Sequence, residues 1–157
     1  MLKRINSKVL RGGNAQFAIV ASRYNGRYVE SMLRAAKAEL RRAGVREVQV
    51  VRVPGAFEIP VVAARLARVS SERSAVMCII CLGVILRGQT THAAHIAEAV
   101  SRALAEIQIK YEVPVIHEAL LLENEEQARV RCLGREHNRG REAAQTALAM
   151  AEVMEKL

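Results

Sequence analysis

The segment from Ala75 to Leu86 (AVMCIICLGVIL) is continuously apolar and ends at Arg87. It is shorter than the roughly 18 apolar residues that a membrane-spanning helix needs, but it has the length of a β-strand covered on both faces. A helical pattern opens at Thr90-Thr91-His92 and continues to Tyr111. A strand that is buried on both faces and followed by a helix is typical of a parallel sheet with helices on each side. We therefore expect an α/β fold.

Three further apolar runs of strand length occur, and each precedes a helical pattern. The runs are Gln16 to Ser22, Glu47 to Val53 and Pro114 to Leu122. The helical patterns are Tyr28 to Gly44 with Asn25 as the N-cap, Ala56 to Val69 with Pro60 in the first turn, Asn124 to Cys132, and a last helix after the polar break Gly134 to Asn138. This alternation predicts four parallel strands joined by right-handed crossovers. We expect one domain over residues 16–157, preceded by a basic segment, residues 1–15.

The composition is that of a folded protein that binds an anion. Apolar residues make up 51% and charged residues 25%, outside the range of disordered chains. Lys and Arg number 24 against 16 Asp and Glu, a net charge of +8, and most of the cations are Arg, which binds phosphate bidentately. The chain has no Trp, three Tyr and two Phe, so it has few rings to stack on bases, which argues against nucleic acid. The basic start lacks the apolar core of a secretory signal, so we expect a cytoplasmic protein that does not bind membranes.

The cysteines are expected to be buried small residues. Cys78 and Cys81 lie in the apolar run, where their odd spacing along a strand directs them to opposite faces. With Cys132 they form an odd set in a reducing compartment, so a disulfide framework is not expected.

Ligands of open α/β sheets bind where the parallel strands end. Four places qualify: Arg23 to Asn25, Pro54 to Glu58, Arg87 to His92, and His117 with its neighbours near the end of the fourth run. We expect these four places to be neighbours. In the third, Gly88 allows close backbone approach and the start of a helix favours an anion such as phosphate. An ordinary turn and N-cap would show the same residues, so spacing alone leaves both interpretations open.

His92 is the candidate general acid/base, because the first turn of a helix favours the neutral imidazole that accepts a proton. His95 follows at i+3, but no Glu lies between the two and no third ligand accompanies them, so we expect no metal. Glu58 is either a helix cap or an acceptor for a polyol, and Tyr24 either packs against a loop or stacks on a planar ring. Arg131 is a candidate phosphate partner.

These motifs together resemble the lumazine synthase family over nearly the whole chain. They are Arg23-Tyr24-Asn25, PGAFEIP at 54–60, GVILRGQTTH at 83–92, Pro114-Val115-Ile116, and EQAxxR at 126–131 followed by Asn138-Arg139-Gly140. The resemblance implies a flavodoxin-like, three-layer αβα sandwich with a central four-stranded parallel sheet. It also implies a cofactor-independent transferase that condenses 5-amino-6-(D-ribitylamino)uracil with 3,4-dihydroxy-2-butanone 4-phosphate. The products would be 6,7-dimethyl-8-ribityllumazine, phosphate and water, in the penultimate step of riboflavin biosynthesis.

The resemblance also implies roles for individual residues. His92 would be the catalytic residue and would move protons during imine formation and phosphate elimination. The substrate-binding residues would be Tyr24, Asn25, Ala56, Phe57, Glu58, Val84, Ile85, Leu86, His117 and Arg139. The phosphate-binding residues would be Gln89, Thr90 and Arg131.

The chain departs from the family pattern at several of these positions. His117, followed by Glu118, stands where the family usually carries Phe, Arg139 stands where Lys is common, and Val84 replaces a frequent Thr. A His can still stack but adds a titratable group, so we expect a pH dependence of substrate affinity that His117→Phe removes.

The family builds its site between subunits of a pentamer, and some members assemble twelve pentamers into a shell. The resemblance therefore implies a homo-oligomer. The polar break lacks the flanking glycines common in shell-forming members, which favours a free pentamer. Riboflavin synthase is a further candidate partner.

Two rival interpretations stay open. One is a flavin- or pterin-like binding module on the same fold that has no turnover. The other is a nucleic-acid-binding protein, suggested by the net charge and by Lys3, Arg4, Lys8 and Arg11 near the start of the chain.

Overall fold

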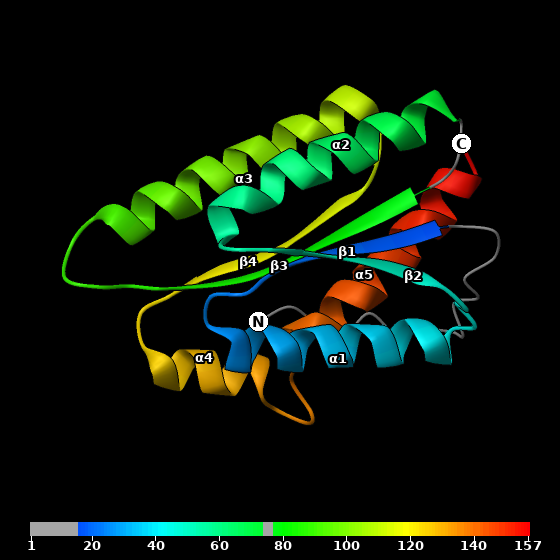
Figure 1. Cartoon of the computed structure of the whole chain (residues 1–157). Coiled ribbons are helices and arrows are strands. Elements are labelled where there is room, and N and C mark those ends of the chain that lie inside the picture. Colours follow the sequence, from blue (N-terminus) through cyan, green and yellow to red (C-terminus); the bar gives the residue numbers. More distant parts are fainter. Residues whose placement is uncertain (1–15, 74–76) are drawn as a thin grey trace.

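The computed structural model describes residues 16–73 and 77–157 (Figure 1). Its strands are β1 (Gln16–Ser22), β2 (Val48–Val53), β3 (Met77–Leu86) and β4 (Val115–Leu122). Its helices are α1 (Gly26–Arg42), the 3₁₀ helix η1 (Ala56–Glu58), α2 (Ile59–Glu72), α3 (His92–Tyr111), α4 (Glu125–Cys132) and α5 (Arg139–Glu155).

The four strands form one parallel sheet in the order β2-β1-β3-β4. Strands β1 and β3 are central, and β2 and β4 are the edges. Helices α2 and α3 cover one face, whereas α1, α4 and α5 lie on the other (Figure 1). The predicted α/β sandwich with four parallel strands is confirmed. The first residues of the predicted Ala75–Leu86 strand lie outside the described residues.

Side chains that alternate along the strands form the two halves of the core. Ile19 and Ile80 are fully buried toward α1 and α5, whereas Val20 and Ile79 are fully buried toward α2 and α3. Burial of a side chain of this size contributes roughly 1.5–3 kcal/mol relative to exposure. The central strands are therefore anchored on both faces, and their carboxyl ends form a rigid platform for the loops that follow.

The cysteines confirm the predicted alternation of the apolar run. Cys78 packs in the α1 and α5 half of the core and Cys81 in the α2 and α3 half. Both have no exposed surface, and Cys132 is buried as well. Burial raises the pKa of the Cys78 thiol to about 12 and that of Cys132 to about 11, so neither is a reactive thiolate.

Polar side chains and one glycine fix the helix ends near β4. Asn124 caps α4, because its side chain accepts a hydrogen bond from the Gln127 amide at 2.9 Å. Asn138 caps α5 by accepting from the Gly140 amide at 2.9 Å, and its Nδ2 donates to the Cys132 carbonyl at 2.7 Å. A Cβ at Gly140 would overlap the backbone of Met32, so α5 crosses α1 at a point where only glycine fits.

Helix α2 begins later than the sequence predicts. The predicted helix starts at Ala56, but residues 56–58 form the 3₁₀ turn and the α-helix starts at Ile59. Pro60 lies in the first turn of α2, as predicted, where its missing N–H is tolerated.

Candidate active site

The loop after β1 is tied to β3 by Asn25. Pairing between β1 and β3 ends at Ala21 and Leu82. Beyond that point the Asn25 Nδ2 donates to the Val84 carbonyl at 2.7 Å, so a side chain continues the strand pairing. Asn25 has a left-handed backbone, with φ 55°, and makes no side-chain cap bond. Asn25 therefore occupies the N-cap position of α1, as predicted, but its side chain bonds to β3 and makes no cap bond.

The loop after β2 packs directly against the loop after β1. The Tyr24 amide donates to the Pro54 carbonyl at 3.0 Å, and the Arg23 amide donates to the same oxygen. A Cβ at Gly55 would lie 2.9 Å from both the Tyr24 ring and Glu58 Oε2, so the absent side chain lets the ring approach. Two of the predicted loops are therefore in contact, as expected.

Glu58 caps the η1 turn with one carboxylate oxygen, and its other oxygen is available to a ligand. Its Oε2 accepts from the Gly55 amide at 2.8 Å, which closes the η1 turn. Its Oε1 has no hydrogen-bond partner among residues 16–73 and 77–157. Both interpretations of Glu58 are therefore compatible, since one oxygen caps the turn while the other can accept from a ligand. Ala56 is buried beneath this turn, whereas the Phe57 ring is exposed.

The loop after β3 leads into α3 without a side-chain cap at Thr91. His92 is the first residue of α3, as predicted, and its amide lies 3.4 Å from Thr90 Oγ1. Gln89, Thr90 and His92 are all exposed. The positive end of the α3 dipole therefore faces solvent beside two polar side chains and an imidazole, an arrangement suited to a phosphate.

The loop after β4 joins the same edge of the sheet. The Arg87 amide donates to the Leu122 carbonyl at 2.8 Å, and its guanidinium lies 3.5 Å from Glu123. Val84 and Ile85 are buried and Leu86 is half-buried at the end of β3. The carboxyl edge of the sheet therefore brings the four loops together.

His117 does not lie at this edge. It is the third residue of β4 and pairs with Cys81, five residues before Leu122, which places it about 16 Å back along the strand. The prediction that His117 lies near the end of the fourth strand is therefore wrong. The apolar run begins at Pro114, so the histidine falls in its first half.

His117 is held by hydrogen bonds on both ring nitrogens. Nδ1 accepts from the Ala119 amide at 3.2 Å, so Nε2 carries the hydrogen and donates to Ser101 Oγ at 2.7 Å. Ser101 in turn donates to the Ala97 carbonyl at 2.8 Å. His117 is exposed, but partial desolvation of its ring lowers its pKa from the usual value of 6.5, so the ring is neutral at neutral pH.

Three charged side chains lie on β4 and on the helices that follow it: Glu118 on β4, Arg131 on α4 and Arg139 on α5. Arg139 begins α5 and binds the Glu118 carboxylate through Nε at 2.9 Å and Nη2 at 2.8 Å. Arg131 is exposed on α4 and makes no ion pair or hydrogen bond among the described residues. The site prediction did not include Glu118. Its signal in the sequence is a carboxylate at an inward-facing position of an apolar strand.

The predicted site residues thus fall into two groups. Loop group A lies at the end of β3 and in the segments that follow β1, β2 and β3, and it holds Tyr24, Asn25, Ala56, Phe57, Glu58, Val84, Ile85, Leu86, Gln89, Thr90 and His92. Edge group B lies on β4, α4 and α5 and holds His117, Arg131 and Arg139. Within loop group A, hydrogen bonds and close contacts join the segments after β1 and β2 to each other and to β3, whereas edge group B extends along the edge strand β4.

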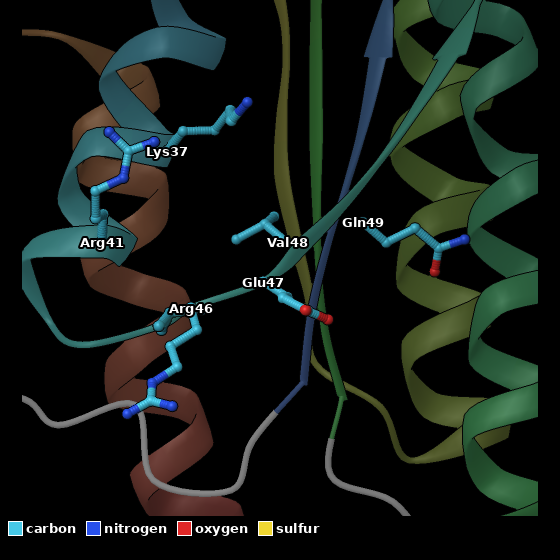
Figure 2. Close-up of a pocket in the computed structure, with 7 residues that line it drawn as sticks. Lys37, Arg41, Arg46, Glu47, Val48 and Gln49 are labelled. Carbon is cyan, nitrogen blue, oxygen red and sulfur yellow. The ribbon is translucent and has the colours of Figure 1, made fainter.

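A basic groove lies at the opposite edge of the sheet. It has a volume of about 490 Å³ between the end of α1 and the start of β2. Lys37, Arg41 and Arg46 line it, and Val48 points toward α1 while Gln49 points away (Figure 2). Because parallel strands place their functional loops at the carboxyl ends, this groove is separate from the candidate active site.

An open parallel α/β sheet whose carboxyl edge gathers a helix N-terminus, an exposed ring and an imidazole defines an enzyme-like small-molecule site. A protein-family model for 6,7-dimethyl-8-ribityllumazine synthase matches residues 14–155. A 6,7-dimethyl-8-ribityllumazine synthase of Stenotrophomonas maltophilia (strain R551-3) is 40% identical over 146 residues, 92% of each chain. Those of Xanthomonas oryzae pv. oryzae (strain PXO99A) and Xanthomonas campestris pv. campestris (strain B100) are 40% and 38% identical over 150 residues, 94% of this chain and 95% of theirs. The chain belongs to the 6,7-dimethyl-8-ribityllumazine synthase family.

Proposed function

We propose that this enzyme condenses 5-amino-6-(D-ribitylamino)uracil with 3,4-dihydroxy-2-butanone 4-phosphate to give 6,7-dimethyl-8-ribityllumazine, phosphate and water. The reaction would need no cofactor and would be the penultimate step of riboflavin biosynthesis. The observation that carries the proposal is the family match over residues 14–155. The polar loops at the carboxyl edge of the sheet support it.

In this proposal the aminouracil is held by the loops after β1 and β2. The Tyr24 ring, which packs on Gly55, would stack on the pyrimidine, and the free oxygen of Glu58 would accept from the ribityl chain. The backbone of Val84 to Leu86 would face the ring. The Val84 carbonyl already accepts from Asn25, so its second lone pair is the one available to substrate.

The phosphate of the second substrate would lie at the start of α3. Gln89 and Thr90 are exposed there, and the helix dipole favours an anion. Arg131 is the matching cation, because it forms no ion pair among the described residues. A carboxylate already pairs with Arg87 on the same loop, which makes Arg87 the weaker candidate.

His92 would move protons between these two substrates. Its place beside Thr90 sets the imidazole next to the proposed phosphate position, where the amine must attack the ketone and phosphate must leave. Holding two substrates together supplies much of the acceleration in a condensation of this type. We therefore expect His92→Ala to slow the reaction without abolishing it.

A homo-oligomer with the site between subunits would unite the two groups of residues. Tyr24, Phe57 and Val61 are large apolar side chains that remain 59–70% exposed on one chain. Surfaces of this kind are typical of subunit contacts. A free pentamer in the cytoplasm, in contact with riboflavin synthase, is the arrangement that we propose. Among the described residues no helix is long and apolar enough to cross a membrane.

The test is turnover by the purified chain. The two substrates are mixed with the enzyme, and lumazine absorbance and phosphate release are followed together. Product formation above the spontaneous rate, with matching phosphate release, would support the proposal. Binding of the aminouracil without any acceleration would contradict it and would favour the non-catalytic binding module. Binding of RNA or DNA with sequence preference and a steep salt dependence would favour the nucleic-acid alternative.

A further inference from the structure

A buried ion pair joins the edge strand β4 to the start of α5. The Glu118 side chain is 7% exposed, and both of its oxygens accept from Arg139, at 2.8 and 2.9 Å. Glu142, one turn further along α5, accepts from Arg139 Nη1 at 2.8 Å. The two departures from the family pattern at positions 118 and 139 are therefore bonded to each other. Lysine at position 139 could not make the same two-point contact.

This pairing fixes the plane of the guanidinium and leaves part of it free. Arginine has five N–H donors, and the three contacts to Glu118 and Glu142 use one donor on each nitrogen. One N–H on Nη1 and one on Nη2 have no partner among the described residues. The Arg139 side chain is still 21% exposed, so these donors can meet a bound molecule.

The charge around Arg139 favours a neutral acceptor over a phosphate. One cation faces two carboxylates, so the ionised cluster carries a net charge of −1. Arg131 on α4 is a further cation that acts on Glu118, and Cys132 on the same helix is uncharged. His117 lies on the opposite face of β4, toward Ser101. A carbonyl oxygen of a planar, uncharged ring suits two N–H donors held in this setting.

We propose that Glu118 is a positioning residue that fixes Arg139 as a two-donor contact for a carbonyl group of the uracil-type substrate. The inference rests on the proposed function, because Arg139 is a substrate-binding residue only if the chain binds the aminouracil. Glu118 does not touch substrate and acts through Arg139.

The pair is sensitive to pH. Burial raises the pKa of Glu118 from 4.5 to about 7, with Arg139 opposing the rise and the nearby Glu142 carboxylate contributing to it. A protonated Glu118 is a weaker hydrogen-bond acceptor than the carboxylate. The Arg139 guanidinium is therefore held less firmly as the pH falls through the neutral range. The enzyme should then bind the aminouracil more weakly on the acid side.

The experiment compares the KM for the aminouracil in wild type and in Glu118→Gln as a function of pH. The ratio of the two KM values removes the titration of the substrate itself. We expect the variant KM to exceed that of wild type by roughly two- to tenfold on the alkaline side, the range of one hydrogen bond, with kcat little changed. The two curves should meet on the acid side, where wild-type Glu118 is protonated. Glu126→Gln, which removes an exposed carboxylate paired with Arg129 on α4, is the matched control and should leave the ratio at one.

Glu142→Gln provides a second variant that keeps the Glu118 and Arg139 pair. Removing this like charge lowers the pKa of Glu118, so the midpoint of the KM profile should move to lower pH. Two results in an active enzyme would overturn the positioning role of Glu118. One is a ratio of the Glu118→Gln KM to the wild-type KM that does not depend on pH, and the other is a pH profile of KM that is the same as wild type in both Glu118→Gln and Glu142→Gln. A wild-type enzyme without turnover would instead contradict the proposed function, and this outcome is distinguishable from failure of the positioning role alone.

Discussion

Replacement of Asn25 by Ala should destabilise the fold and loosen the loop that carries Tyr24. The Asn25 Nδ2 donates to the carbonyl of Val84, a residue that is 3% exposed, at 2.7 Å. Removing that donor leaves a buried acceptor unpaired, which costs about 1–3 kcal/mol. Asn25 also has φ 55°, and an alanine in the left-handed region costs about 1–2 kcal/mol. The sum is a loss of about 2–5 kcal/mol in the free energy of unfolding.

A glycine at the same position separates the two contributions. Asn25→Gly loses the hydrogen bond but adopts the positive φ without strain, so it should be less destabilising than Asn25→Ala. Glu112 is the matched control, because it also has a positive φ, 52°, at the end of α3 and makes no hydrogen bond among the described residues. Glu112→Gly should therefore leave stability unchanged or raise it by up to about 1 kcal/mol.

The assay is urea unfolding of each variant at constant m-value, followed by the KM for the aminouracil. Loosening of the Tyr24 loop should raise this KM in both Asn25 variants. An Asn25→Ala variant within about 0.5 kcal/mol of wild type would refute the reasoning, since that is the scatter of ordinary surface substitutions. A glycine variant less stable than the alanine variant would refute the part that concerns backbone strain.

Three further predictions follow from single contacts. Gly140→Ala forces a methyl group into the backbone of Met32, so it should lower stability by about 1–3 kcal/mol or more, measured as a shift of the urea midpoint. The pKa of His117 is lowered below 6.5, so its own contribution to aminouracil affinity should change only on the acid side of that value. His117→Phe should remove this contribution and leave the change caused by Glu118, and a profile identical to that of wild type would contradict the idea. The pKa of Glu118 is raised to about 7 in the folded chain, so wild type should lose up to about 3 kcal/mol of stability relative to Glu118→Gln as the pH rises from 4.5 through 7. A stability difference that does not vary with pH would show that Glu118 does not titrate in this range.

The parallel sheet was predictable because its strands are apolar runs of the right length. The run that ends at Leu86 is buried on both faces, and the odd spacing of Cys78 and Cys81 placed them correctly in opposite halves of the core. The loops at the carboxyl ends were predictable for the same reason, since strand direction alone brings them to one edge.

The hydrogen-bond and ion-pair partners of individual side chains were not predictable from the sequence pattern. Asn is a residue type favoured at N-caps, but the Asn25 side chain donates a hydrogen bond to Val84, 59 residues away in the sequence. The sequence predicts His117 near the end of the fourth strand, yet the register pairs it with Cys81 in the middle of β3. The Glu118 and Arg139 pair joins residues 21 apart, and only the packing of α5 on β4 brings the two charges together. Local spacing carries no information about contacts of this kind.

Subunit complementation tests most directly whether loop group A and edge group B form one active site. Tyr24→Ala disables a residue of loop group A, and Arg131→Ala disables a residue of edge group B. If each site combines loop group A of one subunit with edge group B of its neighbour, co-assembly of the two poorly active variants restores about one site in four. We predict that the mixed oligomer recovers lumazine formation to about a quarter of the wild-type rate. A mixture that stays as inactive as its parts, while wild type is active and the two variants do co-assemble, would contradict a site shared between subunits.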